Sequence, residues 1–247
     1  MNEQKTTASP EELAKFEAMA DSWWDPNGKF KPLHQFNPKR IGFIRDRGCT
    51  QFSRSPEADT PFDGLTLLDI GCGGGLLSEP MARLGFSVTG IDGVEKNVQV
   101  ARTHAARSDL QINYRAILAE DLHKEGIQFD VVLAMEIAEH VPDLNFFLKI
   151  CGKLVKPGGM LVGATLNRTI RSLLMAKIGA EYILRLLPRG THDWKKFVTP
   201  DEFARGLQET GLRVTDLRGM TFNPFMGSWS ISNDTSVNYI LIAKHPT

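Results

Sequence analysis

Short runs of apolar residues recur along the chain from residue 65 onward, and helical stretches separate them. Taken together, these runs are continuous rather than alternating in their apolarity, whereas a strand with one exposed face would alternate apolar and polar residues. Continuous apolarity is typical of strands that are buried on both faces of a parallel sheet. The predicted strands are LTLLDI (65–70), SVTGID (87–92), INYRAI (112–117), FDVVLAM (129–135) and MLVGATL (160–166).

The end of the chain adds one helix and two more strands to this pattern. A helix is predicted near 200–210, a strand in LRVTDLRGMTF (212–222) and a last strand in VNYILIAKH (237–245). Repeated strand–helix units followed by two late strands are typical of an α/β fold with a Rossmann-like, doubly wound sheet. We therefore expect a mainly parallel sheet with an antiparallel edge strand, in a single domain 1–247.

The first sixty residues follow a different pattern. Ser9 and Glu12 have the spacing of a capping box, and apolar residues then recur at helical spacing as far as Ala20. The segment WWDPNGKFKPLHQFNPKR (23–40) is aromatic and rich in turn formers, so we expect an irregular arm here, with a helix that restarts at Asn37-Pro38 and runs towards Arg47. The segment CTQFSRSPEADTPFD (49–63) is polar and contains proline, which is typical of a linker.

The composition excludes several classes of protein. Lys plus Arg and Asp plus Glu both number 29, so the chain has no net basic field that would attract nucleic acid. The three cysteines form no CxxC pair, which argues against a disulfide framework or a cysteine zinc site. No apolar leader is apparent, and no apolar run is long enough and free enough of charge to span a bilayer. These features favour a cytoplasmic protein.

A glycine-rich turn follows the first predicted strand. In LLDIGCGGG (67–75), Asp69 stands two positions before the turn, and the glycines are Gly71, Gly73 and Gly75. Glycines at the junction of a strand and a helix allow a tight turn and a close approach of a ligand to the backbone. Asp92 ends the next strand, where a carboxylate can bind both hydroxyls of a ribose. Together these features indicate a nucleotide site rather than an ordinary strand–helix turn.

The spacing of the glycines discriminates between nucleotides. A dinucleotide site uses GxGxxG, whereas the third glycine falls one position earlier here. The carboxylate of Asp69 would repel a pyrophosphate but suits an ammonium group, such as the methionyl end of S-adenosylmethionine. FDVVLAMEIAEHVPD (129–143) and LVKPGG (154–159) also resemble the fourth-strand region and the turn before the fifth strand of class I methyltransferases. S-adenosylmethionine is therefore the expected ligand, and an NAD-dependent oxidoreductase is disfavoured.

Seven phrases occur in an order that narrows the resemblance to one family. They are WWDPNGKFKPLH, NPKR, LDIGCGGG, MEIAEHVPD, TLNR, GAEYILRLLPRGTHDWKKF and VNYIL. From about residue 11 to 243 the chain resembles the ubiquinone biosynthesis O-methyltransferase family. The resemblance implies methylation of phenol or catechol hydroxyls on polyprenylated ubiquinone precursors, including the final demethylubiquinol step, with S-adenosylmethionine as donor. It leaves open a ubiquinone-biosynthesis assembly as a partner.

The resemblance also assigns residues to the donor site. It implies contacts from Arg40 in NPKR, Gly71 in the glycine turn, Asp92 and Met135. The guanidinium of Arg40 can pair bidentately with the methionyl carboxylate. Glu120 falls where this superfamily often contacts adenine, although Ile117-Leu118 replace the more usual Gly-Asp before it.

Glu136, Glu139 and His140 form the pattern ExxEH just beyond the fourth predicted strand. A phenol titrates near a pKa of ~10, so its methylation at neutral pH requires a general base or a metal ion. If the turn is helical, the three side chains share one face and can bind Mg²⁺ or Zn²⁺. Two alternatives stay open: His140 acts directly as the base, or these residues only cap a helix and face solvent. His192 is a further candidate for the substrate pocket.

The stretch IRSLLMAKIGAEYILRLLPRG (170–190) is the most apolar of the chain, yet Lys177, Glu181 and Arg185 interrupt it at four-residue intervals. On a helical wheel its basic polar stripe faces a broad apolar side, which is typical of a helix that lies on an anionic membrane surface. A helix packed on the sheet is the alternative. Because a polyprenylated substrate partitions into the bilayer, we favour an enzyme that associates peripherally with the membrane.

The domain divides into four parts along the chain. We expect an N-terminal helical arm and linker (9–63), a donor-binding core (64–166), an amphipathic insertion (167–196) and a C-terminal part of the sheet (197–247). Two rival functions stay open. One is a C-methyltransferase of a quinone pathway, which would not need the ExxEH residues to organise a metal. The other is a non-catalytic lipid-binding module on the same fold.

Overall fold

The computed structural model describes residues 6–174, 194–223 and 226–246. Within these ranges the strands form one sheet in the order β3-β2-β1-β4-β5-β8-β6-β7. Their bounds are β1 Thr66–Ile70, β2 Ser87–Asp92, β3 Asn113–Ala116, β4 Phe129–Met135, β5 Val155–Leu166, β6 Arg213–Asn223, β7 Ser228–Ser232 and β8 Asn238–Lys244. Strands β1 to β5 pair in parallel, whereas β8, β6 and β7 join them through antiparallel pairings. The mainly parallel sheet is confirmed, and its antiparallel part is larger than the single edge strand that we expected.

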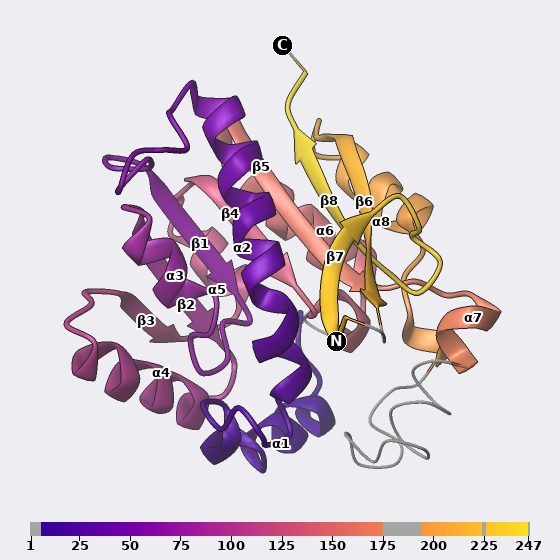
Figure 1. The fold of residues 1–247 in the computed structure, drawn as a ribbon, viewed down its shortest axis with the longest axis horizontal. Coiled ribbons are helices and arrows are strands. Elements are labelled where there is room, and N and C mark those ends of the chain that lie inside the picture. The colour runs from indigo at the N-terminus through magenta and orange to yellow at the C-terminus, as the bar shows by residue number, and fades with distance from the viewer. Residues whose placement is uncertain (1–5, 175–193, 224–225, 247) are drawn as a thin grey trace, which may run out of the picture.

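Helices cover both faces of the sheet (Figure 1). Their bounds are α1 Pro10–Glu17, α2 Lys31–Phe52, α3 Ser78–Arg83, α4 Glu95–Arg107, α5 Ala119–Lys124, α6 Leu144–Lys153, α7 Ile170–Leu173 and α8 Pro200–Gln208. Short 3₁₀ turns occur at η1 Ala20–Ser22, η2 Ala138–His140 and η4 Trp194–Lys196. Helix α2 crosses one face of the sheet, and α1 lies beyond the carboxyl ends of the parallel strands (Figure 1).

The central strands are buried on both faces, as their continuous apolarity predicted. Successive side chains of a strand point to opposite faces. Leu68 of β1 belongs to a cluster that includes Phe147 of α6 and Phe203 of α8. Its neighbour Leu67 belongs to a second cluster, on the other face, that includes Phe43 of α2. The two hydrophobic layers hold the sheet rigidly and leave its carboxyl edge available for a site.

The helix expected from Asn37-Pro38 is present, but it begins earlier, at Lys31, so residues 31–36 belong to the long helix α2 and not to an irregular arm. Pro38 lies inside this helix, where its missing N–H removes one backbone hydrogen bond. Phe36, Phe43 and Ile44 are buried along the helix. Their burial stabilises the helix in spite of the proline, because the packing of an apolar face contributes more to helix stability than local propensity does.

The capping box predicted at the start of α1 forms only in part. The hydroxyl of Ser9 accepts a hydrogen bond of 3.2 Å from the backbone N–H of Glu12. The Glu12 carboxylate does not return to the cap but binds Lys15, His140 and Lys196. The helix start was therefore predicted correctly, while its acidic residue serves contacts with distant parts of the chain.

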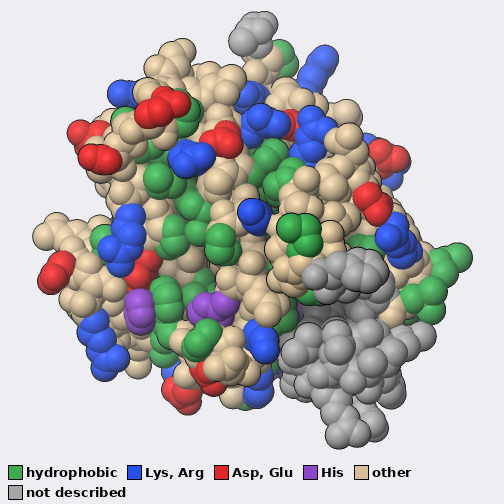
Figure 2. All heavy atoms as spheres, viewed as in Figure 1, with side chains coloured by type: hydrophobic (Ala, Val, Ile, Leu, Met, Phe, Trp, Pro, Cys, Tyr) green, Lys and Arg blue, Asp and Glu red, His purple; other side chains and the backbone are tan. Residues whose placement is uncertain are grey.

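Of the amphipathic stretch 170–190, only the first turn belongs to the described residues. Ile170 and Leu174, at the two ends of α7, expose 75% and 50% of their surface. Hydrophobic side chains project at the place of α7 in Figure 2. The charges Lys177, Glu181 and Arg185 lie outside the described residues, as does His192. None of the described helices is long and apolar enough to cross a membrane.

Candidate active site

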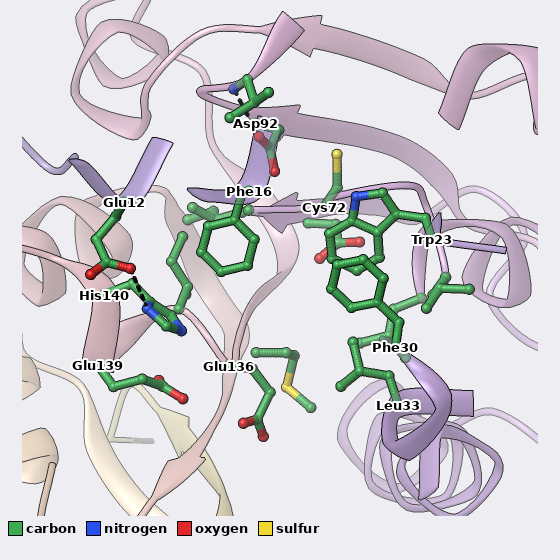
Figure 3. Close-up of a pocket in the computed structure, with 18 of the residues that line it drawn as sticks. Glu12, Phe16, Trp23, Phe30, Leu33, Cys72, Asp92, Glu136, Glu139 and His140 are labelled. Carbon is green, nitrogen blue, oxygen red and sulfur yellow. Dashed lines mark hydrogen bonds and ion pairs between the residues drawn. The ribbon is translucent and has the colours of Figure 1, made fainter. Parts of the chain in front are cut away.

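A cavity of about 720 Å³ lies at the carboxyl ends of β1, β2 and β4. The sheet provides its floor, and the N-terminal arm, from Thr7 to Arg40, forms much of its wall. Figure 3 shows Glu12 and His140 on one side of this cavity and Trp23 and Phe30 on the opposite side. Ligands of open α/β sheets bind at this edge, so the position is that of an active site.

The glycine turn after β1 is anchored to the neighbouring strand. The N–H groups of Gly71 and Cys72 donate hydrogen bonds of 2.8 and 3.0 Å to the carbonyl of Ile91. The carboxylate of Asp92 accepts from the N–H of Gly73 at 3.0 Å and from that of Val94 at 2.8 Å. Asp92 therefore holds the turn in place and still lines the cavity.

The three glycines have different roles in the structure. Gly71 lines the cavity, with a φ of 70° that favours glycine. A Cβ on Gly73 would lie 2.3 Å from the ring of Trp23, and one on Gly75 would lie 2.3 Å from the hydroxyl of Tyr114. These two glycines admit neighbouring side chains and lie outside the cavity lining, so their direct contact with the donor stays a prediction.

Two buried carboxylates give the donor side of the cavity its electrostatic character. Burial raises the pKa of Asp69 to about 7, while a 2.6 Å hydrogen bond from Ser78 partly opposes this shift and the charge of Asp92 adds to it. Burial also raises the pKa of Asp92, against the hydrogen bonds that it accepts. A cation bound beside these groups would stabilise their charged forms. The wall therefore suits a ligand that carries an ammonium or sulfonium charge.

The aromatic arm lies directly on the glycine turn. Trp23 stacks on Phe30, with ring centroids 3.6 Å apart, and its indole N–H donates a 2.9 Å hydrogen bond to Asn97. Asn97 in turn donates to Asp92 at 3.2 Å. The indole N–H of Trp24 donates to the carbonyl of Gly74 at 2.8 Å. The two tryptophans had no predicted role in the site, although a Trp-Trp pair in a polar, turn-rich segment indicates that the rings are buried against other parts of the chain.

Arg40 and Met135, which the resemblance assigned to the donor site, both line the cavity, and their contact with the donor stays a prediction. The Arg40 side chain is 2% exposed, lies over the ring of Phe36 and pairs with Glu136. Its Nε and Nη1 atoms are buried and have no hydrogen-bond partner among the described residues. Met135 ends β4 and lines the same cavity. The unpaired guanidinium nitrogens fit a carboxylate such as that of the methionyl group.

Glu120 has a partner that the sequence did not suggest. Its carboxylate accepts hydrogen bonds from the backbone N–H of Thr7, at 3.0 Å, and from the Thr7 hydroxyl. The side chain does not belong to the lining of the cavity, whereas its neighbours Ile117 to Ala119 do. The structure therefore places Glu120 as an anchor for the N-terminal segment, and its contact with adenine stays a prediction.

The ExxEH residues follow β4 without forming one helical turn. Glu136 has a φ of 54°, outside the helical region, and only residues 138–140 form a 3₁₀ turn. Each side chain has its own partner: Glu136 pairs with Arg40, Glu139 accepts a 2.7 Å hydrogen bond from Thr165, and His140 binds Glu12. The condition for the predicted metal site, a shared helical face, is not met.

The prediction of Mg²⁺ or Zn²⁺ at these residues is therefore not supported. Among the residues that the structure describes, no group of three or more His, Cys, Asp or Glu side chains is arranged to hold a metal ion. The positive φ of Glu136 turns it toward Arg40, while Glu139 is directed to the strand β5. A metal ion would have to displace these contacts before it could bind all three side chains.

His140 and Glu12 form a partly buried acid–base pair. Nδ1 of His140 lies 3.0 Å from the Glu12 carboxylate, and Phe16 covers the imidazole edge-on with ring centroids 5.0 Å apart. The hydrogen bond from His140 holds the pKa of Glu12 well below its usual range. Burial lowers the pKa of His140, but the hydrogen bond to Glu12 and the nearby charges of Glu139 and Glu136 outweigh it and raise the pKa.

Glu139 is the second unusual carboxyl group at this turn. Burial raises its pKa to about 7, and the charge of Glu136 adds to the shift, whereas the proximity of His140 and the bond from Thr165 oppose it. Its side chain is 3% exposed and lines the cavity. The turn therefore brings a histidine and two carboxyl groups to the cavity, with His140 across it from Trp23 and Phe30, where they can accept a proton from a ligand (Figure 3).

Comparison with known proteins agrees with this geometry. A family model described as a methyltransferase domain matches residues 42–217. The ubiquinone biosynthesis O-methyltransferase of Sinorhizobium fredii is 52% identical over 242 residues, which cover 98% of each chain. The protein of the same name from Cereibacter sphaeroides is 54% identical over 242 residues, again with 98% of each chain covered.

Solved structures show the same fold at lower identity. The magnesium protoporphyrin IX methyltransferase of Synechocystis PCC 6803, with bound SAM, is 18% identical, with a TM-score of 0.61 over 98% of this chain and 100% of the other. An N-methyltransferase of Bradyrhizobium japonicum WM9, in complex with S-adenosyl-L-homocysteine, is 17% identical, with a TM-score of 0.61 over 96% and 98%. Fold, site and full-length similarity agree, and the chain belongs to the ubiquinone biosynthesis O-methyltransferase family of class I methyltransferases.

Proposed function

We propose that the protein transfers a methyl group from S-adenosylmethionine to a phenol or catechol hydroxyl of polyprenylated ubiquinone precursors, including the final demethylubiquinol step. One observation carries the proposal: a single cavity joins the donor-type wall around Gly71 and Asp92 to the acid–base pair of His140 and Glu12. Curated relatives with this name match the chain over nearly its whole length, which supports the same activity here.

The donor wall supplies binding and orientation. S-adenosylmethionine, when bound, supplies a methyl group on a positively charged sulfur. Arg40 has unpaired nitrogens for the methionyl carboxylate, and Asp69 has a buried oxygen pair beside the turn for the ammonium group. Asp92 would bind the ribose, and Met135 would pack against the adenosyl or sulfur region. These contacts hold the reacting groups in line, which lowers the entropic cost of the displacement.

The opposite wall supplies the base. When His140 is neutral, its Nδ1–H donates a hydrogen bond to the Glu12 carboxylate. Nε2 then carries no proton and can accept one from the substrate. In the proposed step the phenol O–H bond breaks and its proton passes to Nε2. The oxygen forms a bond to the methyl carbon as the bond between that carbon and the donor's sulfur breaks, and the electron pair stays on the sulfur, so that neutral S-adenosylhomocysteine leaves. The nearby aromatic ring of Phe16 limits the access of water to this proton transfer.

A divalent cation at Glu136, Glu139 and His140 is the second form of this proposal. One observation favours it: Glu139 is buried near the charge of Glu136, and a cation would neutralise both. The contacts of these side chains with Arg40, Thr165 and Glu12 do not fit the ion as they stand, so we derive no step through it. A chelator separates the two forms. Transfer that persists in EDTA supports His140 alone, and transfer that Mg²⁺ or Zn²⁺ restores supports the cation.

Peripheral binding to an anionic membrane, from the cytoplasmic side, completes the proposal. The exposed Ile170 and Leu174 begin the amphipathic stretch, and a polyprenylated substrate would be drawn from the bilayer. Co-sedimentation with anionic vesicles tests this surface. We expect wild-type protein to bind and a variant with the stretch's four basic residues neutralised (Arg171, Lys177, Arg185 and Arg189) to bind less. Equal binding would contradict the electrostatic part.

The methylation assay tests the function as a whole. A catechol with a short prenyl chain and S-adenosylmethionine should give the mono-O-methyl product, identified by mass and by the chemical shift of a methoxy group. A methyl group on ring carbon would support the rival C-methyltransferase. No binding of S-adenosylmethionine in calorimetric titration would leave the lipid-binding module as the surviving alternative.

A further inference from the structure

Besides the donor wall and the wall that holds His140, the cavity has a third wall, which is formed by α2 and the hairpin β6–β7. The strand β7 was not expected from the sequence, and it lies beyond β5, β8 and β6 from the donor wall. On β7, Trp229 meets Phe36 of α2 edge-on and Phe222 of β6 at a tilt, with ring centroids 5.4 Å apart in both pairs. All three rings line the cavity. This aromatic wall is separate from the contacts that hold the glycine turn.

Two polar atoms on this wall have no hydrogen-bond partner among the described residues. They are the indole Nε1 of Trp229 and the side-chain Oδ1 of Asn37, and both are buried. Asn37 itself is 6% exposed and lies on α2 next to Phe36. A buried polar atom without a partner costs free energy, so native proteins retain few of them. Two such atoms, on two residues that line one cavity, indicate a ligand that completes their hydrogen bonds.

The chemistry of the two atoms defines what the ligand presents. The indole N–H only donates, so Trp229 requires an acceptor oxygen. The amide oxygen only accepts, so Asn37 requires a hydroxyl or another N–H or O–H donor. An oxygenated aromatic ring between aromatic side chains meets both requirements and also uses their apolar surfaces. A plain hydrocarbon chain would satisfy neither polar atom.

We propose that Trp229 and Asn37 form a subsite that recognises the oxygens of the acceptor ring, and that they determine which phenols are methylated. Trp229 donates to a ring oxygen next to the reacting hydroxyl, and Asn37 accepts from a ring hydroxyl. This assignment rests on the proposed function. The donor's carboxylate is accounted for by Arg40, whose remaining nitrogens are also unpaired. Trp229 thus favours acceptor rings with an oxygen next to the reacting hydroxyl, while His140 accepts the proton.

Three acceptors with the same short prenyl chain separate the two contacts. A monophenol lacks the neighbouring oxygen, an ortho-methoxyphenol offers an acceptor oxygen, and a catechol offers an oxygen that both accepts and donates. For the wild type we expect KM to fall from the monophenol to the other two acceptors. In Trp229→Phe the KM for methoxyphenol and catechol should rise roughly 3- to 10-fold, as expected for the loss of one hydrogen bond. The KM for the monophenol should not change.

The variant Asn37→Leu tests the other contact. It should raise the KM for the catechol by roughly 3- to 10-fold and leave the methoxyphenol unchanged, because only the catechol hydroxyl donates. Both variants should bind S-adenosylmethionine as the wild type does, which also shows that they are folded. Weaker donor binding by either variant would overturn its assignment to the acceptor, since that residue would then belong to the donor site.

The matched control is Trp194→Phe. The indole N–H of Trp194 donates a 2.9 Å hydrogen bond to the carbonyl of Thr169, and this residue does not line the cavity. We expect the variant Trp194→Phe to change the KM for all three acceptors by the same factor or not at all. If Trp229→Phe behaves in the same way, the subsite is refuted. If the wild type binds the donor but methylates none of the acceptors, the proposed function fails first and the subsite with it.

Discussion

Nδ1 of His140 lies 3.0 Å from the carboxylate of Glu12, although 128 positions separate the two residues in the chain. The same carboxylate accepts a hydrogen bond of 3.2 Å from Lys196, the last residue of η4. One side chain therefore connects the N-terminal arm, the turn after β4 and the segment that follows the amphipathic stretch. Docking of the arm and orientation of the proposed base are coupled through this contact.

The pH dependence of methyl transfer should report this pair. His140 must be neutral to accept a proton, and Glu12, Glu139 and Glu136 raise its pKa above the ordinary value of 6.5, against the effect of burial. The value of kcat/KM should therefore rise with pH through a midpoint above 6.5. In Glu12→Gln the midpoint should move to lower pH, because a neutral amide no longer stabilises the imidazolium.

The same variant should lower kcat about 10-fold, since the amide no longer fixes the imidazole tautomer. The exposed neighbour Glu11 provides the control, because Glu11→Gln removes the same charge from the same helix without touching His140. A pH profile and a kcat that change equally in both variants would mean that Glu12 acts only through net charge.

A substitution at Gly73 tests whether the contact between the arm and the glycine turn is needed for donor binding, once the effect of backbone strain is subtracted. An alanine Cβ there would lie 2.3 Å from Trp23 and would occupy a φ of 54°. Gly126 has a similar φ of 73° with open space around it, so Gly126→Ala carries the strain alone, about 1–2 kcal/mol. Both variants should lose thermal stability, but only Gly73→Ala should weaken S-adenosylmethionine binding, by roughly 10-fold or more, because Trp23 no longer reaches Asn97. Equal donor affinities by calorimetry would argue against the arm's role.

Asp92 should contribute to donor binding through the hydrogen bonds that its carboxylate accepts, and an asparagine at this position would keep only some of them. Its carboxylate accepts from Gly73, Val94 and Asn97, and the residue lines the cavity. Asp92→Asn should reduce the affinity for S-adenosylmethionine roughly 10- to 100-fold. The loss should be smaller for a donor analogue that lacks the ribose hydroxyls. If both ligands lose affinity equally, Asp92 supports the turn and does not bind the ribose.

Much of the fold followed from the sequence because the central strands are buried on both faces. The runs containing Leu68 and Val132 could only be strands of a covered sheet, and they were placed within one residue at each end. The strand β7, with the sequence SWSIS, carries too little apolar surface to be recognised. The helix was expected to start at Asn37-Pro38, and its first turns, from Lys31, were missed because their stability depends on packing that local propensity does not reveal.

The site was predictable only where function and local pattern coincide. Asp92 and the glycine turn lie at strand ends, so their position followed from the strands. The partners of the turn come from the arm: Glu12 binds His140, and Trp23 packs on the glycines. The metal prediction assumed a helical turn at Glu136, whose φ of 54° directs it elsewhere. Such contacts between distant segments leave no periodicity in the sequence.

The ionisation state of Asp69 should change when the donor binds. Burial raises its pKa to about 7, so a substantial share of the free protein holds this carboxyl group protonated at pH 7. An ammonium group bound beside it would favour the carboxylate and lower that pKa. Binding of S-adenosylmethionine at pH 7 should therefore release up to about half a proton.

Calorimetry in buffers of different ionisation enthalpy measures this release directly. At pH 7, where Asp69 is only partly ionised in the free protein and the donor's amino group is mostly protonated, the observed binding enthalpy should vary linearly with the buffer's ionisation enthalpy. Asp69→Asn should abolish the slope at pH 7 while Ser78 keeps a side-chain oxygen as its hydrogen-bond partner. Uptake of a proton, or a slope that survives in Asp69→Asn, would place the donor's ammonium group away from this carboxylate.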